Sequence, residues 1–263
     1  MTPDAINLSI IAPAFLAGLL VLATHVPLGA QVLRRGIVFV DLAIAQIAAL
    51  GVIAAGLLHL EPHGWEVQLA AGAAAAAGAL LLTWTEKRWP EVQEAQIGVI
   101  FVLAATGSLL LLARNPHGGE HLRDLLAGQI LWVNTPQLLL PGIGTIIILV
   151  ALRLIGQKMS GLGFYLLFAL AVTASVQLVG IYLVFASLII PSLGVRNYAA
   201  GRRLPLAYLT GAMGYGAGLT LSLLCDLPAG ALIVWCLALL AALTYWAGPK
   251  DRPATPAPAI SSG

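Results

Sequence analysis

The sequence predicts an all-α, polytopic membrane protein: a bundle of about eight or nine membrane segments, one of them broken or re-entrant. Of its 263 residues, 60% are hydrophobic and only 9% are charged, whereas soluble domains carry roughly 25% charged residues. The apolar residues also fall in blocks that approach the roughly 20 residues needed to cross a bilayer core as a helix. A water-soluble fold of this size would need more polar surface, so we expect a lipid bilayer around it.

The apolar blocks follow one another along almost the whole chain. They cover residues 8–26, 37–60, 65–84, 96–113, 137–152, 162–195, 204–225 and 230–246. The block at 162–195 is long enough for two short crossings, or for one crossing plus a broken helix. We therefore expect one transmembrane domain over residues 1–247. Residues 248–263 are rich in Pro, Ala and Ser, which is typical of a disordered tail.

The basic residues predict the orientation. Cytoplasmic loops of membrane proteins carry an excess of Lys and Arg. With the N-terminus outside and two crossings between residues 162 and 195, every basic residue lies inside except Arg114 and Arg123. A single crossing there would place Arg153 and Arg203 on opposite sides. The returning segment and a cytoplasmic C-terminus are therefore favoured.

Polar side chains inside the apolar blocks are candidates for function because they are expensive to bury in lipid. Asp41 follows the Arg34–Arg35 pair by about two helical turns, and Glu94 lies just after Lys87–Arg88, so both carboxylates are expected at the same inner depth. Their hard oxygen atoms suit divalent cations. The alternative is that each pairs with a neighbouring Arg. Gln46 could line the same path or form a hydrogen bond between helices, and His25, at the end of the first block, is expected to pack or hydrogen-bond.

The predicted outer loop at residues 114–124 contains His117, Glu120 and His121. This H-x-x-E-H order occurs in one class of zinc peptidases, so a membrane zinc-dependent hydrolase is the hypothesis of a different class. The motif requires a helix, however, and Gly118–Gly119 interrupts it while Pro116 marks a turn. A solvated loop is favoured, with a loose metal-gathering loop as the alternative.

The sequence gives no indication that the chain binds nucleic acid or hydrolyses ATP. The net charge of +2 is too small to indicate a nucleic-acid partner. None of the three lysines stands in the Gly-Lys-Ser/Thr context of a Walker A motif, which cradles nucleotide phosphates. If ATP powers a process here, another chain hydrolyses it, and this chain is not itself an enzyme.

Four stretches, in order and spacing, resemble the permease subunits of bacterial ABC importers for zinc, manganese and iron, the ABC-3 family. They are residues 27–29 with 34–35 and 39–41; 86–88 with 94–98; 124–131; and 179–180 with 187–191 and 226–230. The resemblance implies a permease domain at residues 1–247 in the bacterial inner membrane. It also implies a homodimer, cytoplasmic ATP-binding subunits, an extracytoplasmic metal-binding protein and alternating access. The divalent metal ion would be cargo, with no permanently bound cofactor.

The family commonly carries an Asp in the second span, four residues before a His, and Asp41 matches the carboxylate. Position 45 is Ala, and the nearest polar neighbour is Gln46, a weak neutral oxygen ligand. The family also has a longer cytoplasmic segment where this chain has only residues 153–161. A diverged relative with a non-metal cargo, or one without ATPase coupling, is therefore the alternative.

Overall fold

The computed structural model describes residues 8–57, 65–113, 126, 128, 130–155 and 161–249, and it confirms the all-helical fold. Its regular elements are α1 (Leu8–Arg35), α2 (Val40–Leu57), α3 (Trp65–Arg88), η2 (Pro90–Val92), α4 (Gln93–Leu112), η3 (Ile130–Trp132), η4 (Thr135–Leu138), α6 (Leu139–Ile155), α7 (Gly161–Val179), α8 (Ile181–Gly194), α9 (Ala200–Cys225) and α10 (Ala229–Ala247). The tail predicted at 248–263 lies outside the described residues from position 250 onward.

Seven of the described helical segments are long and apolar enough to cross a membrane. They are α1, α2, α3, the η2–α4 unit, the η4–α6 unit, α7 and α10. Helix α8 is apolar but shorter, with 14 residues, and α9 has 26 residues but begins with Arg202 and Arg203 among its first turns. The predicted eight or nine segments thus correspond to seven helices of this kind plus α8 and α9.

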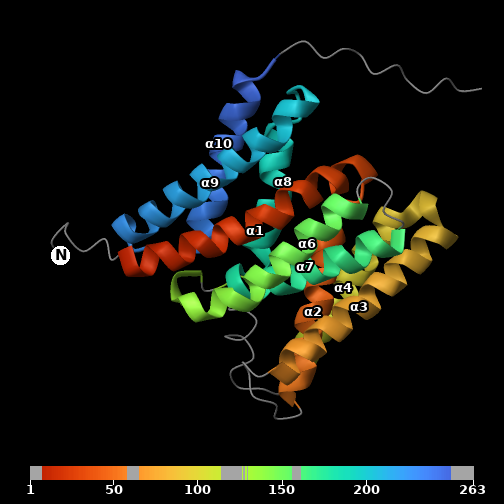
Figure 1. Ribbon diagram of the computed structural model, residues 1–263. Helices are drawn as coiled ribbons and strands as arrows, with labels where there is room; N and C mark the ends of the chain where they lie inside the picture. Colours follow the sequence, from red (N-terminus) through yellow and green to blue (C-terminus); the bar gives the residue numbers. More distant parts are fainter. Residues whose placement is uncertain are drawn as a thin grey trace, which may run out of the picture.

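The helices form two groups that meet along α1, α7 and α8 (Figure 1). Helix α2 packs against α3 and α4, whereas α10 packs against α8 and α9. Helix α1 runs between the groups and packs against both α8 and α9. Burial agrees with this arrangement. In the apolar stretch of α7, 61% of the residues are buried, whereas only 11% are buried in that of the η4–α6 unit. The interior is therefore built around α1, α2, α7 and α8.

The long apolar block at 162–195 is divided at Gly180 into α7 and α8. Gly180 has a φ of 82°, a conformation that residues with a Cβ rarely adopt. Helix α7 begins with Gly161 against the side chain of Glu86, at the end of α3. Helix α8 begins with Tyr182 and Leu183 beside Pro228 and ends with Gly194 against Ala241 of α10. The two helices therefore run in opposite directions through the bundle.

Helix α1 extends nine residues beyond the predicted block, through Pro27 to Arg35. Proline has no N–H, so the carbonyl of Ala23, four residues earlier, loses its helical hydrogen bond. The hydroxyl of Tyr208 on α9 donates to that carbonyl at 2.9 Å. A partner from a distant helix replaces the lost backbone donor, which allows a proline inside a membrane helix. The expectation that the first span ends at residue 26 was therefore wrong.

All the lysines and arginines of the described residues lie at one end of the bundle, which we call the basic end. They are Arg34, Arg35, Lys87, Arg88, Arg153, Arg196, Arg202 and Arg203. Arg35 contacts Glu86 of α3, and Arg196 contacts Tyr245 of α10. By the positive-inside rule this end is expected to face the cytoplasm.

Candidate functional site

Asp41 is the second residue of α2, and its side chain is completely buried. Neither of its carboxylate oxygens has a hydrogen-bond partner among the described residues. Helix α2 is central, since it packs against α3, α4 and α7. A buried charge without a partner is unfavourable unless something compensates it. An ionisable residue held in this way inside a membrane bundle indicates a functional site.

Glu94 lies in the first turn of α4 and reaches the beginning of α2. Its Oε1 accepts a hydrogen bond from the backbone N–H of Phe39 at 3.2 Å, two residues before Asp41. Its Oε2 is buried and has no hydrogen-bond partner among the described residues. The structure therefore brings both carboxylates to the region where α2 begins, at the basic end.

Gln46 is also on α2 and is 5% exposed. It follows Asp41 by five residues, so the two side chains leave the helix about 140° apart at 100° per residue. Ala45, one residue earlier, lies on the side of the helix that carries Asp41. The helix thus directs Gln46 and Asp41 to different neighbours.

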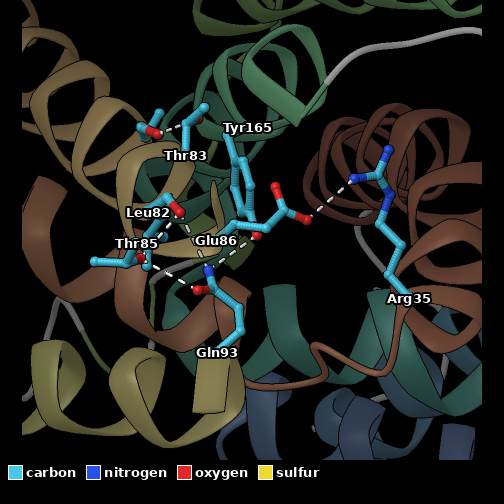
Figure 2. Close-up of polar contacts among 8 residues, drawn as sticks. Arg35, Leu82, Thr83, Thr85, Glu86, Gln93 and Tyr165 are labelled. Atoms are coloured by element: carbon cyan, nitrogen blue, oxygen red, sulfur yellow. Dashed lines mark hydrogen bonds and ion pairs between the residues drawn. The ribbon is translucent and has the colours of Figure 1, made fainter. Parts of the chain in front are cut away.

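A polar network beside the two carboxylates joins α1, α3, α4 and α7 (Figure 2). Arg35 at the end of α1 lies 3.8 Å from Glu86 of α3, and its guanidinium lies 4.2 Å from the ring centroid of Phe164. Gln93, at the start of α4, donates to the carbonyl of Leu82 and to the hydroxyl of Tyr165, both at 3.2 Å. The network fixes the relative positions of these helices at the basic end.

The network shows an ion pair of Arg35 with a carboxylate other than Asp41. The sequence allowed each carboxylate to pair with a neighbouring arginine. In the structure the ion pair of Arg35 is with Glu86, 51 positions away in the chain. The oxygens of Asp41 are left without a hydrogen-bond partner in the described part of the chain.

Gln93→Met is expected to lower the free energy of unfolding by about 1–3 kcal/mol, because it leaves the buried Tyr165 hydroxyl without its hydrogen-bond partner. Methionine has a similar volume, so packing is largely preserved. Denaturant unfolding in detergent measures the effect. Tyr165→Phe is the control, since it removes only one of the bonds and should lose about 0.5–1.5 kcal/mol. An unchanged transition for Gln93→Met would show that the network does not stabilise the bundle.

His25 was expected at the end of the first span but lies inside α1 and is completely buried. Its Nδ1 is 3.0 Å from the carbonyl of Val21 and also from the Thr24 hydroxyl, while its Nε2 has no hydrogen-bond partner among the described residues. The predicted hydrogen bonding of His25 is present, but the residue lies in the interior of the helix and not at its end. The sequence placed His25 at the end of the first apolar block, because the block was bounded at residue 26.

His117, Glu120 and His121 lie outside the described residues. Within the part of the chain that the structure describes, no group of three or more His, Cys, Asp or Glu side chains is placed to hold a metal ion. Asp41 on α2 and Glu94 on α4, both near the start of α2, are thus the candidate site that the described residues provide.

Comparison with known families agrees with the helical architecture. The family model of the ABC 3 transport family matches residues 7–164 and 156–248, which together span almost the whole chain. The chain belongs to this family. As an ABC 3 family member it is a multi-pass membrane protein, in keeping with its apolar helices.

Relatives of the ABC 3 chain extend over most of its length. The manganese transport system membrane protein MntC of Halalkalibacterium halodurans is 26% identical over 247 residues, covering 85% of this chain and 82% of MntC. Among solved structures, PsaBC from Streptococcus pneumoniae in complex with Fab has a TM-score of 0.74 at 20% identity, covering 93% of this chain and 92% of that one. An inward-facing metal-chelate type ABC transporter has a TM-score of 0.65 at 15% identity, covering 94% and 90%. The structural likenesses establish the shared fold.

Proposed function

We propose that this ABC 3 family protein is the membrane-spanning permease subunit of a bacterial inner-membrane importer for a divalent metal ion of the manganese, zinc and iron class. The observation that carries the proposal is the fully buried carboxylate of Asp41, whose oxygens have no hydrogen-bond partner among the described residues. The relative MntC is described as part of a manganese transport system, which supports metal as the cargo.

In this proposal Asp41 is the principal cargo ligand within the bundle. Carboxylate oxygens are the ligands that manganese and other hard divalent cations prefer. A divalent ion beside Asp41 would compensate a charge that the surrounding residues do not. Glu94 of α4, whose Oε2 has no hydrogen-bond partner in the described part of the chain, is a further ligand along the route toward the basic end. Alternating access would expose this region to one side of the membrane at a time.

Energy and cargo delivery would come from other chains. The proposal requires two cytoplasmic ATP-binding subunits, an extracytoplasmic metal-binding protein and a second copy of the permease. The connection between α6 and α7 has only residues 156–160, which is short for a docking helix. The start of α9 is exposed from Ala200 to Pro205 and follows the α8–α9 connection at the basic end. This segment is the better candidate for the ATPase contact.

Arg202→Glu combined with Arg203→Glu is expected to weaken association with the ATPase subunit by about tenfold or more, because reversing two charges at an interface introduces like-charge contacts. Pull-down of the ATPase with the tagged permease measures the loss. Lys87→Glu with Arg88→Glu is the matched control, since this basic pair is also exposed at the basic end but belongs to the α3–α4 connection. If both double variants lost ATPase binding equally, the start of α9 would not be the specific ATPase contact.

The second candidate is a relative with another cargo or without ATPase coupling. The short connection between α6 and α7 favours the loss of coupling, whereas the residues around Asp41 bear on which cargo is carried. Ala45 occupies the position where the family commonly has a His, and the helix directs Gln46 away from Asp41. The site is therefore richer in oxygen than in nitrogen ligands, which favours manganese over zinc among metal cargoes.

The proposal is tested by reconstituting the permease in proteoliposomes with and without a cognate ATP-binding subunit. We expect manganese uptake that requires both ATP and the ATPase. Flux that proceeds without the ATPase would support the uncoupled relative, and ATP-driven transport that excludes manganese, zinc and iron would support another cargo.

A further inference from the structure

A shallow groove lies between α3 and α4 on the outside of the bundle. Its lining residues are Leu81, Thr85, Trp89, Val92, Ala95, Gln96, Val99 and Ile100. Its volume is about 360 Å³, within the range of about 300–1,000 Å³ of small-molecule sites. Because both helices are long and apolar enough to cross a membrane, the groove opens toward lipid.

A pair of cations lies at the end of the groove. Leu81, Thr85 and Arg88 are spaced four and three residues apart, so they share one face of α3. Arg88 thus continues the wall of the groove to the basic end, where Lys87 is its exposed neighbour. Glu91 is an exposed acid in the same connection, while Glu86 is bound to Arg35 and Glu94 to Phe39. Two exposed cations therefore face one exposed acid at the mouth of the groove, because the carboxylate of Glu94 keeps its charge but is directed to the start of α2.

Two tryptophans place this mouth at the surface of the bilayer. Trp84 and Trp89 are partly exposed and meet edge to face, with ring centroids 5.2 Å apart. Arg88 lies 6.0 Å from the centroid of the Trp89 ring. Exposed tryptophans gather at the headgroup level of membranes, so the two cations are level with lipid phosphates.

We propose that this groove binds an anionic phospholipid of the cytoplasmic leaflet, with one acyl chain along the α3–α4 wall and its phosphate against Lys87 and Arg88. Basic pockets between membrane helices on the cytoplasmic side favour anionic headgroups. Gln96 adds a polar group inside the groove, and its Oε1 is buried without a hydrogen-bond partner among the described residues.

The experiment is native mass spectrometry of the full-length chain in detergent, titrated with dioleoylphosphatidylglycerol or with dioleoylphosphatidylcholine. We expect preferential binding of the anionic lipid. Lys87→Gln with Arg88→Gln should weaken its apparent affinity about 30-fold, the factor for two cations near an anionic headgroup. Ala95→Phe, which fills the groove and leaves both charges in place, should remove binding of both lipids.

The control is Arg202→Gln with Arg203→Gln, an exposed basic pair at the same end that does not line the groove. It should bind phosphatidylglycerol as the wild type does. Equal weakening in the control would mean that any basic pair attracts the lipid and would overturn the site, as would undiminished lipid binding in Ala95→Phe. If Ala95→Phe instead dissociated a dimer and left lipid binding intact, the groove would be a contact between two copies. Thermal unfolding of each variant verifies that the bundle is folded.

Discussion

Asp41→Asn is expected to reduce ATP-driven manganese uptake by at least about 100-fold. Mutation of a residue that only orients a metal ligand typically lowers metal affinity or activity about 10–100-fold. Loss of a charged residue that binds the metal directly should lower it by more. Asparagine has almost the same shape, so packing around the buried position is preserved while the negative charge is lost. Uptake into proteoliposomes containing the permease and its ATPase measures the effect.

The matched control for this change is Glu91→Gln. Glu91 is a carboxylate at the same end of the bundle, but it is exposed in the connection before α4. Its neutralisation should leave uptake unchanged. Full uptake by Asp41→Asn, or an equal loss in the two variants, would remove Asp41 from the transport path.

Gly29→Ala is expected to destabilise the contact between α1 and α8 strongly. A Cβ at position 29 would collide with the backbone carbonyl of Leu188 on α8, and a backbone cannot move aside as a flexible side chain can. Overpacking a tight interior costs about 1–3 kcal/mol and occasionally more. We expect a loss of at least about 3 kcal/mol, measured as a lower midpoint of thermal unfolding in detergent.

Gly98→Ala is the matched control for Gly29→Ala. Gly98 is also inside a helix, α4, but nothing lies within 4 Å of the position that its Cβ would occupy. The same chemical change there should be neutral or slightly stabilising, because Ala loses less conformational freedom than Gly in a helix. Similar midpoints for the two variants would mean that α1 and α8 are not held at the close distance of the structure.

The sequence predicted most of the fold because the membrane imposes a local rule on it. Each apolar block corresponds to a helix, since a chain in lipid must satisfy its backbone hydrogen bonds internally. The break in the long block was also expected, and it falls at Gly180. The positions of the helices and the break depend on the composition of a short stretch of consecutive residues.

The differences arise where a distant residue decides the outcome. Helix α1 continues through Pro27 because Tyr208, 185 positions away, binds the freed carbonyl of Ala23. Helix α4 begins at Gln93, before the predicted block, because Tyr165 and Thr85 provide partners for its buried amide. A short sequence window contains neither Tyr208 nor Tyr165.

In the candidate site, too, the sequence predicted what depends on local position and not what depends on distant residues. The chain positions of Asp41 and Glu94 suggested a common depth, but their surroundings could not be predicted. The sequence did not show that Arg35 would form an ion pair with Glu86, 51 positions away, or that the oxygens of Asp41 would have no hydrogen-bond partner among the described residues. His25 was underestimated for a related reason, since its burial depends on α1 continuing past Pro27.

The central claim is that the buried carboxylate of Asp41 holds the metal cargo. Electron paramagnetic resonance of Mn²⁺ titrated into the purified full-length chain tests it most directly, because bound and free Mn²⁺ give distinct signals. We predict saturable binding by the wild type and by Glu91→Gln, and its loss in Asp41→Asn. Equal Mn²⁺ binding by the wild type and Asp41→Asn would contradict the account.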